Sequence, residues 1–293
     1  MKHIADYFSY ARERYSILLK RRAGVPAPWT TDPVLSKYRF CNVFRQDDIV
    51  TQWIVENLCK PLSAGGNLEW NLIPVLCAAR FINRVPTLNR MKDILLEEGW
   101  HSKACVAILK DIKKSGKPLI TGAYMVRTPY GMDKSEGLDV ILKPVQDWAE
   151  IFSGQGAPVV EPNETLQQAH AWLCEFEYFG SFMAYEVVTD LSYCRPFTDV
   201  MTWANAGPGC ARGCSRLEFG EIGHYSQGNV KHQVRMQEMM QEIVSIANSE
   251  SSRWPADWPR WDMRTAEHTF CEYDKYMRAI RNEGEPKQLY RGA

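Results

Sequence analysis

The sequence lacks the signatures of several common enzyme classes. The glycine-rich stretch at 207–213 does not end in the Gly-Lys-Ser/Thr run that holds a nucleoside triphosphate, so no Walker A motif is present. There is also no HExxH motif, no GxSxG motif and no GxGxxG motif before a strand. These absences predict that the chain is not itself a P-loop kinase, a zinc peptidase of the HExxH type or an α/β-hydrolase.

The sequence also lacks an excess charge and a long hydrophobic run. Lys plus Arg and Asp plus Glu number 35 each, so any surface for nucleic acid must come from local clusters. Two basic clusters interleaved with aromatic residues occur, at 12–22 and at 37–45. We predict that Lys20, Arg21 and Arg22 contact DNA, with a solvated helix face as the open alternative. The longest apolar run, Asn71–Ile82, is too short to span a bilayer, which predicts a soluble protein without a membrane partner.

Cysteine is present without the spacing of a framework. The chain has nine cysteines, an odd number, and no signal peptide. This predicts reduced thiols in a cytosolic compartment and no disulfide scaffold. Cys210 and Cys214 have no second Cys or His pair at metal-ligand spacing, so they are interpreted as small packing residues. The sequence predicts neither a metal site nor a cofactor.

Helical periodicity dominates what remains. Apolar residues recur every three and four positions in most of the chain, which predicts a mainly α protein. Thr165, Asp199 and Asn229 are placed to begin helices, whereas Gly99 and Gly116 are placed to end them. We predict a single helical catalytic unit over 1–293, in which a Gly- and Pro-containing segment at 153–163 can separate two lobes.

The stretch Asn205–Leu217 is the most distinctive local feature. Gly207 and Gly209 are two residues apart, with Gly213 four residues on, in a sequence that separates two helical runs. Such a turn exposes backbone N–H groups to a phosphate, and Arg212 or Arg216 adds charge. It predicts a helix-hairpin-helix element over 198–220 that binds a nucleic-acid backbone. A plain turn between two helices is the open alternative.

Two polar tracts are candidates for a reaction site. Tyr38–Asp48 combines arginines, an asparagine and paired acids with aromatic residues, a mixture suited to a polar pocket. Glu267–Arg278 places acids and bases on adjacent faces of a predicted helix. The alternatives are an Arg45 to Asp48 ion pair in the first tract and a salt-bridged surface helix in the second.

Four tracts together resemble a known group of proteins. They are RYSILLKRRAGVPAPWTTDPVL at 14–35, KYRFCNVFRQDD at 37–48, ANAGPGCARGCSRL at 204–217 and EHTFCEYDKYMR at 267–278. In this order they resemble the helical proteins of DNA-thymine hypermodification in bacteriophages. That group includes alpha-glutamyl/putrescinyl thymine pyrophosphorylases, amino acid:DNA transferases and the helical domain of 5-hydroxymethyluracil DNA kinases. The resemblance implies a fold similar to helix-hairpin-helix DNA glycosylases.

The resemblance also implies a reaction and its partners. A kinase phosphorylates the 5-hydroxymethyl group of the base in double-stranded DNA, and a protein of this type replaces the phosphate or pyrophosphate with an amine. The implied amine is an amino acid, with glycine favoured, or a polyamine, and the implied place is the cytoplasm of the infected bacterial host. A DNA glycosylase acting on a modified thymine, and a non-catalytic module that partners a DNA kinase, are the alternative functions.

Candidate roles follow from what this reaction requires. Cationic groups must bind the leaving phosphate, a carboxylate must take a proton from the ammonium, and an aromatic ring must stack on the extruded base. The predicted catalytic residues are Arg39, Asn42, Arg45, Asp48, Glu272, Asp274 and Lys275. The predicted substrate-binding residues are Tyr38, Tyr124 and Arg278, and the predicted DNA-binding residues are Lys20, Arg21, Arg22, Gly207, Gly209, Arg212 and Gly213.

Overall fold

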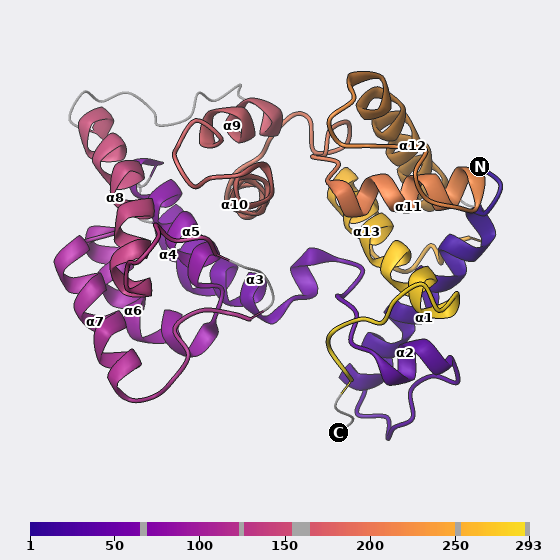
Figure 1. The fold of residues 1–293 in the computed structure, drawn as a ribbon, viewed down its shortest axis with the longest axis horizontal. Coiled ribbons are helices and arrows are strands. Elements are labelled where there is room, and N and C mark those ends of the chain that lie inside the picture. Colours follow the sequence, from indigo (N-terminus) through magenta and orange to yellow (C-terminus); the bar gives the residue numbers. More distant parts are fainter. Residues whose placement is uncertain (65–68, 123–125, 154–164, 250–252, 291–293) are drawn as a thin grey trace. The chain divides into compact units, whose positions relative to one another are not determined.

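The computed structural model describes residues 1–64, 69–122, 126–153, 165–249 and 253–290, and these residues are mainly helical (Figure 1). They contain no β-sheet; an isolated antiparallel bridge joins Tyr38 and Leu289. The mainly α prediction is therefore confirmed. The elements, of which η1 is a 3₁₀ turn and η2 a π-helical turn, are α1 (Ile4–Arg22), α2 (Pro33–Lys37), η1 (Arg45–Asp47), α3 (Ile49–Ile54), η2 (Val55–Cys59), α4 (Lys60–Ala64), α5 (Glu69–Ile82), α6 (Val85–Glu98), α7 (Ser102–Lys114), α8 (Lys134–Ser153), α9 (Leu166–Leu173), α10 (Ser181–Cys194), α11 (Pro208–Phe219), α12 (Val230–Asn248) and α13 (Met263–Ile280).

The chain divides into two compact units. Unit 1 comprises 1–48 and 200–293, and unit 2 comprises 49–199. The predicted separation at 153–163 falls within the range of unit 2, and residues 154–164 lie outside the described part of the chain, so that separation stays a prediction. Among the described residues, no helix has the length and the apolar character needed to cross a lipid bilayer.

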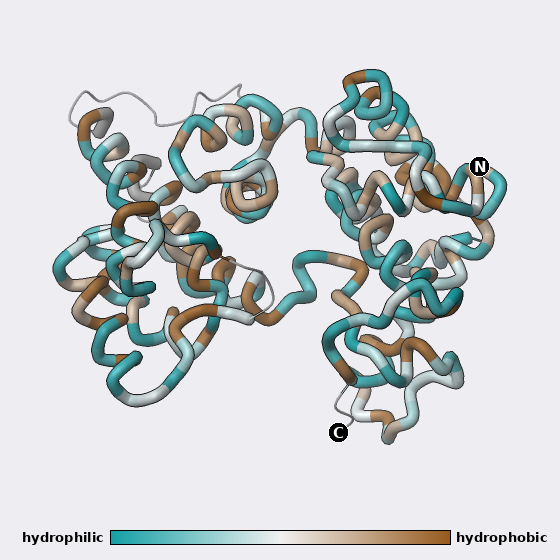
Figure 2. The backbone as a smooth tube through the Cα atoms, viewed as in Figure 1, coloured by the Kyte–Doolittle hydropathy of each residue, from teal (hydrophilic) through white to brown (hydrophobic). Residues whose placement is uncertain are grey.

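Helix α13 organises the core of unit 1. Its buried Phe270 and Tyr273 pack against Tyr7 of α1, with ring centroids 4.8 Å and 5.4 Å apart. Trp261, which lies just before α13, is almost fully buried against the same ring. Figure 2 shows hydrophobic and hydrophilic residues alternating along the helices, as expected when each helix buries one stripe. The aromatic contacts between α1 and α13 thus hold the two ends of the chain together.

Helix α11 packs unusually closely on α13, and two glycines allow it. A Cβ atom added at Gly213 would lie 3.0 Å or less from the backbone of Phe270, and one added at Gly209 would overlap Sγ of Cys271. By contrast, a Cβ atom at Gly207, the N-cap residue of α11, would meet open space. Gly209, the second residue of α11, and Gly213 give the helix a close-packed face, whereas the N-cap residue Gly207 is not crowded.

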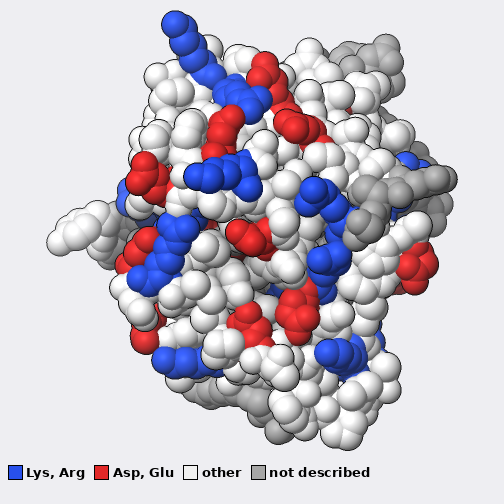
Figure 3. Space-filling view, turned by 90° about the vertical axis from the view of Figure 1, so that its right-hand side faces the viewer, with Lys and Arg blue, Asp and Glu red and all other residues white. Residues whose placement is uncertain are grey.

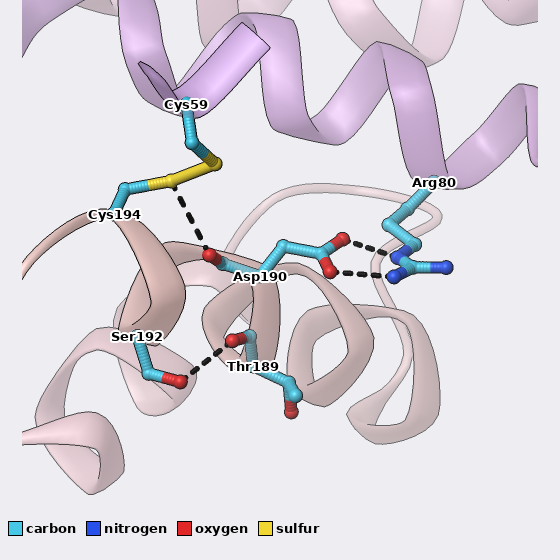
Figure 4. Close-up of a disulfide and its surroundings, with 6 residues drawn as sticks. All are labelled: Cys59, Arg80, Thr189, Asp190, Ser192 and Cys194. Atoms are coloured by element: carbon cyan, nitrogen blue, oxygen red, sulfur yellow. Dashed lines mark hydrogen bonds and ion pairs between the residues drawn. A yellow bond between two sulfur atoms is a disulfide. The ribbon is translucent and has the colours of Figure 1, made fainter. Parts of the chain in front are cut away.

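Unit 2 contains a buried ion pair at its centre. Arg80 of α5 is fully buried and forms a bidentate pair with Asp190 of α10 (Figure 4). Its Nη2 also donates to Oγ1 of Thr51 (2.7 Å) and its Nη1 donates to Oδ1 of Asn83 (3.1 Å). These hydrogen bonds satisfy the guanidinium in a region from which water is excluded, and they connect α3, α5 and α10.

A disulfide adjoins this ion pair. Cys59 of η2 and Cys194 of α10 are bonded, with their Cα atoms 5.2 Å apart (Figure 4). The prediction that all nine thiols are reduced is therefore wrong at these two positions. Their separation of 135 residues carries no sequence signal, because only the packing of η2 on α10 brings them together.

Helix ends follow the predicted signals at several positions. Thr165 caps α9 in a complete capping box, and Asn229 caps α12. Gly99 and Gly116 have φ angles of 69° and 72°, the left-handed region that glycine favours after a helix. Asp199 does not begin a helix as predicted. Its carboxylate accepts from the backbone N–H groups of Leu166 (2.7 Å) and Gln167 (3.1 Å), so it caps α9 from a distant position.

Candidate active site

The four tracts that carry the resemblance all lie in unit 1 and meet around α13. The hydroxyl of Tyr276 donates to Oδ2 of Asp32 (2.6 Å), and the backbone N–H of Cys41 donates to Oε2 of Glu272 (2.9 Å). The tract 204–217 contacts α13 through Arg212, whose Nε donates to Asp274 (2.8 Å). The tracts Tyr38–Asp48 and Glu267–Arg278, which were predicted to share a site, are therefore in direct contact.

A compact polar group surrounds Glu272, and we call Arg14, Cys41, Asn42, Glu272 and Lys275 the Glu272 cluster. Glu272 is 7% exposed, and its Oε1 lies 2.8 Å from Nζ of Lys275. Arg14 approaches from α1, where its Nη2 donates to the carbonyl of Phe40 (3.1 Å) and to Oδ1 of Asn42 (2.8 Å). The cluster therefore combines an anion, two cations and an amide within a nearly buried region.

The charges of the cluster are fixed by their mutual contacts. Burial alone would raise the pKa of Glu272, but Lys275, His268 and the N–H of Cys41 outweigh it and hold that pKa below its ordinary value. Burial opposes the charge of Lys275, yet Glu272 keeps its pKa above the usual range. Burial raises the pKa of the Cys41 thiol to about 12, and Glu272 adds to this shift. At neutral pH the cluster thus holds a carboxylate, an ammonium and a protonated thiol.

Arg45 and Asp48 lie beside the cluster. They form a close ion pair, as the i,i+3 alternative for this tract predicted. Nδ2 of Asn42 donates to the carbonyl of Asp47 (2.9 Å) and approaches Oδ1 of Asp48 (3.4 Å). Asn42 therefore links Arg14 to the η1 turn, so three of the predicted catalytic residues belong to one continuous network.

His268, one turn before Glu272 on α13, was not among the predicted site residues. Its Nε2 is buried and has no hydrogen-bond partner in the described part of the chain. Burial lowers the pKa of His268 to about 4, and the nearby Arg264 contributes in the same direction. The imidazole is therefore neutral at pH 7.

The lowered pKa of His268 predicts a pH dependence of stability. The unfolded chain binds a proton near pH 6.5 and the folded chain only near 4, so the free energy of unfolding falls as the pH drops through this window. Replacing His268 by Gln should flatten the change in unfolding free energy between about pH 7 and 5, measured by urea denaturation. An identical change in the wild-type protein and the variant would show that His268 does not titrate as described.

Asp274 has different surroundings from Glu272. It is fully buried and accepts from Nε of Arg212 and from Nε of Arg216, both at 2.8 Å, with Nε of Arg278 at 3.5 Å. Arg216, which is 1% exposed, also pairs with Glu283. Asp274 therefore joins α11 to α13 through ion pairs, and its predicted catalytic role and that of Arg278 as a substrate group stay untested.

The remaining predicted residues are placed as follows. Tyr38 is buried, with Nζ of Lys37 4.7 Å from its ring, and Arg39 is exposed. Tyr124 lies outside the described residues. Lys20 donates to the carbonyl of Trp29 (2.7 Å) and Arg22 pairs with Asp47 (2.8 Å). No contact in the structure tests their predicted roles in DNA binding.

The surface charge agrees with the neutral composition. Figure 3 shows one face of the molecule on which Lys and Arg side chains are interspersed with Asp and Glu. Many of the cations form ion pairs, such as those of Arg235 with Glu218 and Lys143 with Asp147. DNA binding would thus depend on local groups of unpaired cations.

Comparison with known proteins decides the family. Residues 1–285 match the family model described as "5-hmdU DNA kinase, helical domain". The chain belongs to this family. A 5-hmdU DNA kinase of Bacillus phage SP10 is 27% identical over 294 residues, which cover 92% of this chain and 44% of the phage protein. The chain thus spans less than half the length of this relative, and no solved structure matches it significantly.

The family of 5-hmdU DNA kinase helical domains is one of those that the four tracts suggested, so the resemblance is confirmed at that level. Sequence reasoning missed Arg14 and Cys41 as members of the cluster, although both lie inside the tracts. Arg14 was recognisable only as part of a basic run, and Cys41 acts through its backbone N–H group. The identity of a residue does not show whether its backbone N–H group contacts a site.

Proposed function

We propose that this chain is a DNA-modifying transferase that displaces the phosphate, or pyrophosphate, of 5-phosphomethyl-uracil in phage DNA with the amine of an amino acid, glycine being favoured. The observation that carries the proposal is the ion pair of the buried Glu272 with the half-buried Lys275 at the junction of the four tracts. The family and the name of the relative support the substrate, because a 5-hmdU DNA kinase acts on the base that such a transferase would consume. Its place of action would be the cytoplasm of the infected host.

The proposed reaction exchanges one bond for another at the 5-methylene carbon. The ammonium of the amino acid first gives a proton to Glu272, which is ionised at neutral pH. The nitrogen lone pair then forms the C–N bond as the C–O bond to phosphate breaks. The phosphate departs with that electron pair, and the nitrogen releases a second proton to solvent. Electron release from the pyrimidine ring would assist the departure.

The surroundings of the two candidate carboxylates favour Glu272 as the proton acceptor. Glu272 contacts one ammonium and one N–H group, and Lys275 can exchange its partner for a carboxylate of the substrate. Asp274 already contacts three arginines that connect two helices, so using it as a base would disrupt packing. We therefore assign the proton transfer to Glu272 and keep Asp274 as a structural residue.

Arg39 and Arg45 remain the proposed phosphate-binding cations. Arg45 is paired with Asp48 and would have to bind the phosphate while it keeps this contact. The exposed Arg39 has no ion-pair partner within the described residues. A planar guanidinium can bind two phosphate oxygens at once. Asn42 and Asp48 would hold Arg45 in position. The base would be extruded from the duplex to bring its methylene to the cluster.

A non-catalytic module for a DNA kinase is the second candidate function. Its support is the family itself, since the matched region of the kinase family is its helical domain and the relative is more than twice as long as the matched segment. In that case the chain would bring a separate kinase to DNA. A glycosylase would act on the same base but release it.

One assay distinguishes these functions. The protein is incubated with duplex DNA containing 5-phosphomethyl-uracil, together with glycine, other amino acids and putrescine, and the digested nucleosides are analysed by mass spectrometry. A nucleoside–amine adduct is the expected product. A released base would indicate a glycosylase, and an unchanged nucleoside would contradict transfer and support the module.

A further inference from the structure

A pocket of about 630 Å³ lies in unit 1 at the end of α1, and none of its lining residues belongs to the Glu272 cluster. It is lined by Arg21, Arg39, Lys287, Gln288, Leu289 and Tyr290. Three of these six residues are cationic and none is acidic. The volume lies within the range of small-molecule sites and far exceeds what a single inorganic phosphate would fill.

The three cations of this pocket belong to the unit 1 cations that form no ion pair in the described part of the chain. Within the described residues, Arg21, Arg39 and Lys287 form no ion pair. Elsewhere in the unit, carboxylates neutralise Arg22, Arg45, Arg212, Arg216, Arg235, Arg264 and Lys275. Three cations with no ion-pair partner among the described residues therefore line this pocket with no carboxylate among its lining residues, in a chain whose net charge is zero. Such a concentration attracts phosphate-bearing ligands.

The pocket is held in shape by its own contacts. The guanidinium of Arg21 lies 5.5 Å from the ring centre of Trp29 and 5.8 Å from that of Tyr290. The backbone N–H of Tyr290 donates to the carbonyl of Lys37 (2.8 Å), and that of Arg39 donates to the carbonyl of Gln288 (2.9 Å). Arg39, Lys287 and Tyr290 thus belong to backbone segments that pair with each other, and Arg21 of α1 contacts the ring of Tyr290.

We propose that this pocket binds a nucleotide, with Arg21 and Lys287 around its phosphate and Tyr290 against its base. Arg39, assigned above to the leaving phosphate, lies in the lining beside them. The inference rests on the proposed function in one respect, that the chain acts on DNA, and it names a docking position for the strand. A base can stack on an aromatic ring without regard to its sequence, and phosphate contacts supply the remaining affinity. An unpaired nucleotide of a DNA strand is the ligand that this chemistry favours. A free nucleotide presents the same groups.

The test measures binding of unmodified DNA, so that it is independent of amine transfer. Fluorescence anisotropy of a labelled ten-nucleotide oligothymidylate is recorded over a series of salt concentrations for the full chain and four variants. Lys287→Ala should weaken binding and reduce the slope of log affinity against log salt by about 1. Tyr290→Ala should weaken it at least about fivefold, with recovery in Tyr290→Phe. Lys114→Ala removes an exposed lysine of unit 2 and should leave the affinity unchanged.

Competition identifies the source of the nucleotide. Weak displacement of the oligonucleotide by thymidine 5′-monophosphate supports a strand-binding pocket, and displacement at equal concentration supports a free-nucleotide pocket. Equal losses in Lys287→Ala and Lys114→Ala would overturn the proposal, because they would reflect total charge alone. Wild-type affinity in both Lys287→Ala and Tyr290→Ala would also overturn it, whatever the outcome of the amine-transfer assay.

Discussion

Replacing Asp274 by Ala is expected to lower the free energy of unfolding by about 3–5 kcal/mol. The reason is Arg216, which is 1% exposed and would keep a buried charge after losing its fully buried partner. Its second partner, Glu283, is 39% exposed and can compensate only in part. Arg212 and Arg278 are each more than a third exposed and can turn toward solvent, so they add little to the loss. Urea denaturation followed by far-UV circular dichroism measures the change.

Two further variants isolate the cause of this loss. Asp257→Ala removes an exposed aspartate of the same unit and should change the unfolding free energy by no more than about 0.5 kcal/mol. The double change Asp274→Leu with Arg216→Met replaces the pair by apolar groups and should recover much of the stability. A loss in Asp274→Ala as small as that of Asp257→Ala would show that the Arg216–Asp274 pair is not buried as described.

Local signals in the sequence predicted the helix ends where the partner was also local. Thr165 bonds within its own first turn, and a glycine such as Gly99 needs only its own φ angle. Asp199 carries the same kind of signal as Thr165 but caps a helix 33 residues earlier in the chain. A short polar side chain can satisfy any exposed N–H group within reach, so its identity predicts a cap without saying which helix it caps.

The site could be predicted as a pairing of tracts but not as a set of contacts. The sequence indicated that Tyr38–Asp48 and Glu267–Arg278 belong together, and a hydrogen bond from the backbone N–H of Cys41 to Glu272 indeed joins them. Nothing local distinguished Glu272 from Asp274, because their difference lies in residues of α1, α11 and the segment after α2. The glycines show the same limit. A phosphate-binding turn and a close helix contact both need Gly209 and Gly213, and only the neighbour across the contact shows that packing uses them here.

Replacing Glu272 by Gln is expected to lower the turnover of the proposed amine transfer by about 10² or more, which corresponds to about 2.7 kcal/mol in the activation free energy. Gln keeps the volume and can still accept from the N–H of Cys41, but it cannot take a proton from the ammonium. Turnover is measured as nucleoside–amine adduct formed per protein at saturating glycine. Far-UV circular dichroism and the melting temperature establish that the variant is folded.

The loss in Glu272→Gln has to be separated from the loss of the Lys275 ion pair, since Gln removes that pair as well. Glu272→Ala leaves room for a small acid, so added formate should restore part of the turnover if the missing function is proton acceptance, whereas chloride should not. Glu238→Gln, which alters an exposed ion pair with Arg235 on α12, serves as the matched control and should keep wild-type turnover. If Glu272→Gln retains turnover, neither the carboxylate nor its ion pair with Lys275 is needed for the reaction. If formate and chloride act alike on Glu272→Ala, the carboxylate only supports Lys275. The proton acceptor must then be sought elsewhere in the cluster.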